Sequence, residues 1–351
     1  MTSPLLAHLR AATAFDHQPT FGRLRDYHVP FESLIGGRPV EARLEEASSR
    51  SGRAALIGPS GCGKSSVISY VLEDESKPVA SLVIPVASVR PELMSEPTAV
   101  ADRMIHLISR TARDRRLIGT EEERRAVSRA ATHRVVTLGR DVRGSVGVNA
   151  GWFKGQLATD LARQADAAVD ITPEEKLETI NQVITSIEDA GLHPVLVFDD
   201  TDRWISGKGI ERPEKVVESF FGRVVRWVAD LGCGLVVAVH NSYLEGPSRA
   251  ELLEPFDTPI EVPLLPHAGA ATKVLERRLA IATTGSEFAG ATSSDVFEDG
   301  AIERLFEMYA ESGSRLRWLI RTVHMALTES CDAGDDLITV ASIEAAGVAD
   351  I

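Results

Sequence analysis

One stretch of the sequence, RAALIGPSGCGKSS at residues 53–66, limits the fold more than any other. Within it, Gly58 to Ser65 matches G-x-x-x-x-G-K-[ST] at every fixed position. The apolar run at 54–57 predicts a buried strand, and SSVISYVL after the loop predicts the start of a helix. The alternative is a chance glycine loop before a helix. Because motif and context agree, we predict a phosphate-binding loop in an α/β fold.

The residue types in this loop suit a nucleoside triphosphate bound together with Mg²⁺. Glycines let the backbone wrap tightly, so that its N–H groups and the helix N-terminus face phosphate oxygens. Lys64 can reach the β- and γ-phosphates, and the Ser65 hydroxyl can ligate Mg²⁺. We therefore expect ATP and Mg²⁺ as cofactors. The nucleotide-binding residues expected in the loop are Gly58, Pro59, Ser60, Gly61, Cys62, Gly63, Lys64, Ser65 and Ser66.

A cluster of acids follows a second apolar run, PVLVF at 194–198. Its sequence, DDTDR, places three carboxylates within four residues, which is unfavourable unless a cation or a reaction uses them. The strand is expected to end beside the phosphate loop. Asp199 is then predicted to hold Mg²⁺ through water, and Asp200 to orient or deprotonate the attacking water. Many ATPases carry a longer Glu at the second position, so slow turnover is expected. Asp202 and Arg203 form either a local ion pair or a solvated surface pair.

The remaining pattern predicts the layout of an α/β protein. Apolar runs at 79–87, 233–241 and 259–266 join the two strands above, and helical patterns alternate with them. This indicates a five-stranded parallel sheet flanked by helices. From residue 267 onward the pattern is helical and predicts a small C-terminal lid. We expect an ATPase domain over 1–265, with an insertion at about 113–175, and a helical lid domain over 266–351.

Composition and net charge limit the partners and the cellular compartment that we expect. The formal net charge of -13 disfavours non-specific binding of nucleic acid over the whole surface. The sequence has neither a run of eighteen apolar residues nor a signal-peptide pattern at its start. Cys62, Cys233 and Cys331 are scattered and form no C-x-x-C pair, so neither a disulfide framework nor a zinc site is expected. These features predict a cytoplasmic protein with no membrane partner.

These motifs together resemble the AAA+ superfamily, and most closely its branch of origin-recognition-type, transposon-associated and STAND-like ATPases. The resemblance covers the chain from about residue 35 to the end. Residues 37–41 (GRPVE) resemble the G-R-x-x-E box that precedes the phosphate loop (Walker A) in that branch. This implies that Arg38 belongs to the nucleotide site, since the box lines the adenine pocket.

Two further motifs resemble the sensors of this superfamily. LVVAVHN (235–241) is similar to the sensor 1 strand, which implies that Asn241 or His240 contacts the γ-phosphate or the attacking water. For His240 the alternative is a satisfied core or turn histidine. SGSRLRWLIR (312–321) is similar to the start of the sensor 2 helix, which implies that Arg317 meets the γ-phosphate. Arg315 is the competing candidate, and a solvated helix arginine is the alternative for Arg317.

The resemblance also implies assembly, because ring-forming members complete the site with an arginine from a neighbouring subunit. Segment 242–257, between the fourth and fifth predicted strands, offers Arg249 for this role. Arg223 and Arg226 on the preceding predicted helix are alternatives. With such an arginine finger the chain is expected to form a homo-oligomer in the presence of ATP, and without one to switch as a monomer.

Two features depart from the origin-binding members. Those proteins continue past the lid into a winged-helix domain, whereas this sequence ends at Ile351, so sequence-specific duplex binding is not expected. In addition, residues 110–143 hold ten arginines against five acids. This strip suits DNA phosphates or an acidic partner, or it is a solvated helix face. Trp152, Phe153 and Lys154 either stack on bases, dock a partner, or pack as anchors.

Three functional hypotheses follow. The first is a Mg²⁺-dependent ATPase that acts as a regulatory or assembly switch and recruits a protein effector, in bacterial defence or a mobile element. The second is a transposition-regulator-like ATPase that oligomerises on duplex DNA through the basic insertion. The third is a signalling module that holds ADP and barely hydrolyses ATP. The catalytic residues predicted are Lys64, Asp200, Asn241, Arg249 and Arg317, and the metal ligands are Ser65 and Asp199.

Overall fold

The computed structural model describes residues 3–36, 39–49, 51–74, 79–85, 100, 104, 173–189, 191–201, 213–245, 249–313 and 315–348. Several predictions fall on other positions. Outside the described residues lie Arg38, Asp202 and Arg203, the arginine-rich strip 110–143, and Trp152, Phe153 and Lys154.

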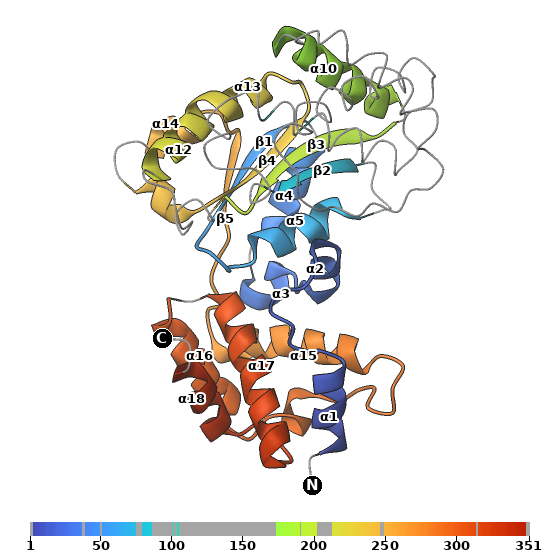
Figure 1. Cartoon of the computed structure of the whole chain (residues 1–351), viewed down its shortest axis with the longest axis vertical. Helices are drawn as coiled ribbons and strands as arrows, with labels where there is room; N and C mark the ends of the chain where they lie inside the picture. Colours follow the sequence, from blue (N-terminus) through green and yellow to red (C-terminus); the bar gives the residue numbers. More distant parts are fainter. Residues whose placement is uncertain are drawn as a thin grey trace, which may run out of the picture. The chain divides into compact units, whose positions relative to one another are not determined.

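Five strands form one sheet in the order β2-β3-β4-β1-β5 (Figure 1). β1 and β5 pair in parallel, with Leu56 opposite Ile260. All of β4, and β3 after its first residue, are buried, which explains why both read as unbroken apolar runs. The predicted five-stranded parallel α/β sheet is confirmed. The strands are β1 (Arg53–Ile57), β2 (Val79–Pro85), β3 (His193–Asp199), β4 (Gly234–Val239) and β5 (Thr258–Glu261).

Helices flank the strands. α4 and α5 each pack a buried apolar face against the sheet or against each other. α4 packs against β1, β5 and α5, and buries Val40 and Leu44. α5 starts at the phosphate loop and buries Val67 and Ile68. The helices between and beside the strands are α4 (Val40–Ser48), α5 (Lys64–Leu72), α10 (Pro173–Asp189), α12 (Pro213–Ser219), α13 (Arg226–Ala229) and α14 (Arg249–Leu253), with a short 3₁₀ turn, η3 (Asn241–Leu244).

The helix predicted over 213–232 forms, but it is not regular. Between α12 and α13 the chain makes a π-helical segment, η2 (Phe220–Val225). Its sequence places two adjacent buried pairs, Phe220–Phe221 and Val224–Val225, on the inner side. The Phe220 ring meets the Phe198 ring of β3 edge-on at 5.3 Å. A wider turn lets both members of an adjacent pair face the sheet, which a regular α-turn does less well.

The C-terminal part is helical, as predicted, and it includes the N-terminus of the chain (Figure 1). α17 packs against α16 and α18, and α1 packs against α15 and α17. α2 packs against both α5 and α15. The sequence pattern did not predict α1 or α2. These helices are α1 (Pro4–Ala11), α2 (Phe21–Tyr27), α3 (Phe31–Ile35), α15 (Ala268–Thr283), α16 (Ala301–Glu311), α17 (Leu316–Ala333) and α18 (Val340–Val348), with a 3₁₀ turn, η4 (Ser293–Asp295).

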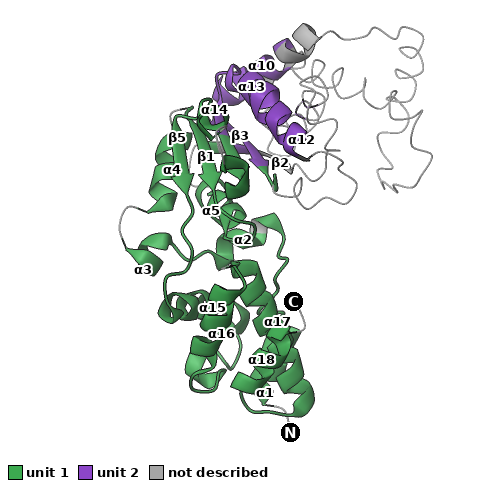
Figure 2. Ribbon diagram, turned by 90° about the vertical axis from the view of Figure 1, so that its left-hand side faces the viewer, with its two compact units in different colours: residues 1–79, 199–202, 236–351 green, residues 80–198, 203–235 purple. Residues whose placement is uncertain are grey.

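Contacts divide the chain into two compact units (Figure 2). The first unit contains residues 1–79, 199–202 and 236–351, and the second contains 80–198 and 203–235. The first unit holds every described residue among the predicted catalytic, nucleotide and metal residues. The boundary expected at residue 265 stays a prediction. Cys62, Cys233 and Cys331 are buried and belong to no disulfide, and no helix in the described ranges is long and apolar enough to cross a membrane.

Candidate functional site

The predicted phosphate loop connects the end of β1 to the start of α5. Gly58 N–H donates to Val239 O (3.1 Å) and Val262 N–H donates to Ile57 O (2.8 Å), so the loop begins between the ends of β4 and β5. Gly61 and Gly63 have φ values of +75° and +110°. This left-handed backbone strongly favours glycine, and such turns build the concave N–H arrays that bind anions. The fixed glycines of the motif are thus required by the turn itself.

Lys64 folds back over the loop. The residue is only 7% exposed, and its Nζ donates to Gly58 O (2.8 Å) and Pro59 O (2.9 Å). An ammonium carries three N–H donors, so these two bonds hold the charge beside the glycine turn. A phosphate oxygen that enters the loop can take the place of either carbonyl. Ser65 follows in the first turn of α5, half-exposed.

The two acids at the end of β3 differ in backbone conformation. Asp199 is the last residue of β3 and is 6% exposed, whereas Asp200 has a φ of +62°. Asp is one of the few residues other than glycine that adopt this conformation at modest cost, on the order of 1 kcal/mol. The next residue holds it there: buried Thr201 donates through Oγ1 to Ala238 O of β4, and Tyr243 Oη donates to Thr201 O (2.6 Å).

The strand order brings these two groups of residues to one edge of the sheet. β4 lies between β3 and β1, and its last residues bond both Thr201 and Gly58. Neighbouring strands lie about 4.8 Å apart, so the ends of β3 and β1 are separated by roughly 10 Å. That spacing has room for phosphate oxygens and a hydrated Mg²⁺ between Asp199 and Ser65.

The end of β4 separates the two sensor 1 candidates. His240 caps η3: its Nδ1 accepts from Ser242 N–H (3.2 Å) and shares a hydrogen bond with Ser242 Oγ (2.8 Å). Its ring also meets the Tyr243 ring at 6.0 Å. Asn241 is exposed at the start of η3. These bonds within the turn favour a structural role for His240 as a turn histidine. Asn241 therefore stays the predicted sensor 1 residue.

The start of α17 docks directly on the phosphate loop. Arg317 N–H donates to Gly61 O (3.2 Å), and a Cβ added to Gly61 would lie 3.1 Å from Arg317 Cβ. Arg315, at the N-cap of α17, has its Cβ 3.9 Å from the same point. Both arginines are exposed. The structure therefore brings both sensor 2 candidates beside the loop, and their roles stay predictions.

The arginine finger candidate lies on the surface. Arg249 begins α14 and pairs loosely with Glu261 of β5, with Nη2 and Oε1 3.4 Å apart and the arginine side chain 57% exposed. Arg223 and Arg226 are exposed on η2 and α13. An exposed arginine can reach a neighbouring subunit, but this one already has an acidic partner in its own chain.

A largely apolar cavity adjoins the phosphate loop, and sequence reasoning missed most of its wall. Its residues come from the segment between α2 and α3, from the loop and α5, and from the chain after β5. The lining comprises Tyr27, His28, Val29, Phe31, Leu34, Cys62, Gly63, Ser66, Pro263, Leu264, Leu265, Val274, Tyr309 and Leu316. Apolar and aromatic walls of this kind are common in sites that bind flat aromatic rings.

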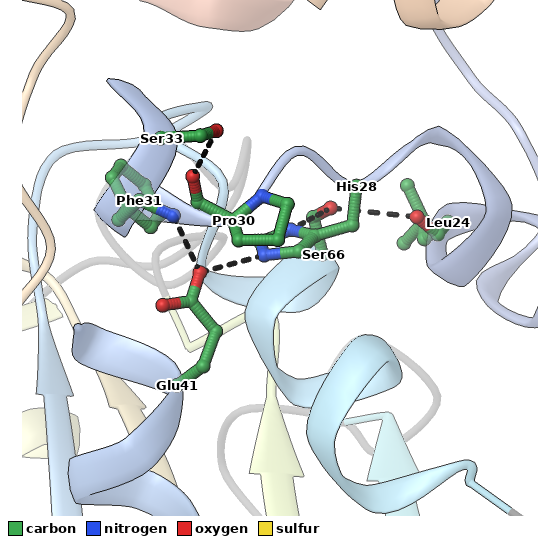
Figure 3. Close-up of polar contacts among 7 residues, drawn as sticks. All are labelled: Leu24, His28, Pro30, Phe31, Ser33, Glu41 and Ser66. Carbon is green, nitrogen blue, oxygen red and sulfur yellow. Dashed lines mark hydrogen bonds and ion pairs between the residues drawn. The ribbon is translucent and has the colours of Figure 1, made fainter. Parts of the chain in front are cut away.

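Glu41 of the GRPVE box bonds to two residues of this wall, His28 and Phe31 (Figure 3). Its Oε1 accepts hydrogen bonds from Phe31 N–H (2.9 Å) and from His28 Nε2 (2.7 Å). Burial would raise the pKa of Glu41, but the bonds from His28 and Phe31 outweigh it and hold the pKa below its ordinary value. His28 Nδ1 in turn shares a hydrogen bond with Ser66 Oγ (3.0 Å). The box thus shapes the cavity through residues that carry no recognisable motif.

No protein family model matches the chain, and no curated protein matches it. A structure of the Aeropyrum pernix ORC1 protein in complex with DNA superposes with a TM-score of 0.50 at 12% identity, covering 92% of this chain and 66% of that one. This chain therefore shares its fold with that ORC1 protein.

Other origin-recognition structures score lower and add nothing to that assignment. The A. pernix ORC2 protein, in ADPNP–ADP complexes, gives a TM-score of 0.46 at 12% identity and covers 88% of this chain and 65% of its own. Drosophila ORC bound to DNA gives 0.43 at 11% identity and covers 94% and 66%. The chain thus spans about two thirds of the length of the structures that it matches.

Proposed function

We propose that the chain binds ATP with Mg²⁺, hydrolyses it, and uses the cycle as a regulatory switch for a protein effector. The observation that carries this proposal is the docking of α17 on a phosphate loop that satisfies every fixed position of the motif. The loop supplies the phosphate cradle, the adjoining cavity suits the base, and Arg317 and Arg315 stand at the loop.

The residues present fit this cofactor pair. Lys64 and the N–H groups of the loop meet the triphosphate, and the Ser65 hydroxyl and Asp199 carboxylate would hold Mg²⁺. Bound there, Mg²⁺ neutralises charge on the phosphate oxygens. Asp200 orients or deprotonates the attacking water, and Asn241 and Arg317 meet the γ-phosphate. As a carboxylate on left-handed backbone, Asp200 has a fixed and short reach, in keeping with slow turnover.

Contact between α17 and the loop supplies the switch. Arg317 belongs to the C-terminal helices, and its backbone N–H donates to Gly61 O of the loop. Loss of the γ-phosphate would remove the contact proposed for the Arg317 side chain and leave this backbone bond in place, which weakens the link between helix and loop. The expected outcome is a change in the surface offered to an effector, and ATP-dependent self-assembly through Arg249.

A second function, oligomerisation on duplex DNA, rests on a different observation. Ten arginines within 110–143 form a local excess of positive charge in an acidic chain. Such a strip binds phosphates with an affinity that falls steeply with salt. The A. pernix ORC1 protein of the comparison was solved with DNA, and this chain shares its fold.

One experiment separates the two. ATP turnover is measured with and without duplex DNA at low and moderate salt, and particle size is followed by light scattering. Turnover that DNA stimulates, with particles that grow on it, supports assembly on DNA. Turnover that DNA leaves unchanged supports the effector switch. Charge reversal at Arg115, Arg116, Arg124 and Arg125 removes the DNA response if the strip is its footprint.

A further inference from the structure

The segment 21–35 is bonded on two sides. Toward α15, Arg277 Nε donates to Asp26 O (2.7 Å) and Lys273 Nζ donates to Ser33 O (2.5 Å). Toward α5, Ser69 Oγ donates to Phe21 O (2.9 Å) and Arg25 Nη1 donates to Glu73 O (2.8 Å). We call this segment the strap. It connects the helix that carries the phosphate loop to the first C-terminal helix.

The ring of His28 joins the strap to two other elements. The ring is buried, with 4% of the side chain exposed, and it uses both nitrogens (Figure 3). Nε2 meets the Glu41 carboxylate of α4 at 2.7 Å, and Nδ1 meets Ser66 Oγ of α5 at 3.0 Å. Since an ionised carboxylate only accepts, Nε2 carries a proton and donates it. The ring also packs on Tyr70 of α5, with centroids 4.5 Å apart.

These contacts of His28 lie beside the phosphate loop. Ser66 directly follows Ser65 in the first turn of α5, and both His28 and Ser66 line the cavity beside the loop. Glu41 also accepts from Phe31 N–H, and Phe31 is another wall residue. A single chain of hydrogen bonds therefore runs from the phosphate-loop helix, through the wall of the base cavity, to α4.

We propose that His28 is a positioning residue that couples recognition of the base to recognition of the phosphates. The inference rests on the proposed nucleotide binding. By tying the cavity wall to the first turn of α5, the ring holds the wall where the base of a loop-bound nucleotide arrives. Hydrogen bonds that preorganise a site in this way raise affinity for the whole ligand, because the wall need not be ordered on binding.

The test compares two ligands that share the phosphates and differ in the base. The dissociation constants of ATP and of inorganic tripolyphosphate are measured by calorimetry at one Mg²⁺ concentration. We expect His28→Ala to weaken ATP about tenfold or more and to change tripolyphosphate by less than about threefold. His28→Asn, whose amide occupies the Nδ1 position, and His28→Gln, whose amide occupies the Nε2 position, are expected to fall between the wild type and His28→Ala.

A matched control is His267→Ala. His267 is an exposed histidine that caps α15 by accepting from Ala270 N–H (3.1 Å), and it lies outside the cavity lining. Its loss is expected to lower stability without changing the ratio of the two dissociation constants. If His28→Ala weakens both ligands equally, or neither, the coupling is wrong while nucleotide binding stands. If the wild type binds neither ligand, nucleotide binding and the coupling both fall.

Discussion

At the residue scale, Gly61 is under two separate constraints. Its φ is +75°, and an added Cβ would lie 3.1 Å from Arg317 Cβ. Gly285 has the same φ of +75° but nothing within 4 Å of an added Cβ. The two glycines therefore separate backbone strain from the contact between the loop and α17.

We predict that Gly61→Ala and Gly285→Ala each destabilise the fold by about 1 kcal/mol through φ alone. Gly61→Ala is expected to cost more and to weaken ATP binding, because Arg317 must also move. Urea denaturation and ATP titration of both variants check this. Equal losses in stability with unchanged ATP binding would mean that the contact between α17 and the loop has no role.

Asp200 permits a similar separation, because asparagine also tolerates left-handed backbone. We predict that Asp200→Asn keeps ATP binding within about threefold and lowers turnover at least about a hundredfold, since the amide cannot accept a proton. Asp230→Asn, at an exposed acid after α13, serves as the control. Turnover near the wild-type rate in Asp200→Asn would show that the water is activated by another group.

The lowered pKa of Glu41 predicts that the stability of the fold depends on pH. Its pKa is lowered in the folded state, so its stabilising contribution is complete above the ordinary carboxyl value of about 4.3 and is lost as the pH falls through the folded value. Glu41→Gln is expected to cost about 1–3 kcal/mol at neutral pH and progressively less below about pH 4. Urea denaturation at several pH values measures this, with exposed Glu32→Gln as the control. A constant difference at all pH values would contradict the account.

At the scale of elements, the sheet was predictable and the strap was not. Runs such as PVLVF and GLVVAV are short, apolar and bounded by polar or glycine residues, so each strand could be placed from local pattern alone. The Phe220–Val225 segment departs from the predicted α-helix, because its wider π-helical turn gathers the two buried pairs on a narrower face. α1 and α2 have weaker patterns, and tertiary contacts with α15, α17 and α5 give them their places.

In the candidate site, too, some residues could be predicted from the sequence and others could not. Gly58 to Ser65 and Asp199 stand in motifs with fixed spacing, so the sequence alone could propose them. His28, Tyr27 and Phe31 line the cavity beside the phosphate loop from a segment without a motif. Their link to Glu41 and Ser66 depends on how α4 and α5 pack, which residue spacing does not encode. The sequence itself offers only weak guidance there, a histidine shortly before the GRPVE box.

At the scale of the whole molecule, assembly depends on whether Arg249 acts outside its own chain. Its partner, Glu261, gives a control: if the pair is only structural, Arg249→Ala and Glu261→Gln should have equal and small effects. We predict instead that Arg249→Ala lowers turnover at least about tenfold while Glu261→Gln does not. ATP turnover across a range of protein concentrations, with light scattering, checks this. Equal effects would remove Arg249 as a finger.

The most direct test of the central claim is ATP turnover by the wild type beside Lys64→Ala, at saturating Mg²⁺. The charge of Lys64 sits over the loop on Gly58 O and Pro59 O, where the phosphates are proposed to bind. Exposed Lys215→Ala on α12 is the matched control. We predict slow turnover in the wild type and in Lys215→Ala, and a loss of at least about a hundredfold in Lys64→Ala. Turnover that survives in Lys64→Ala, or none in the wild type with or without DNA, would contradict the proposed ATPase.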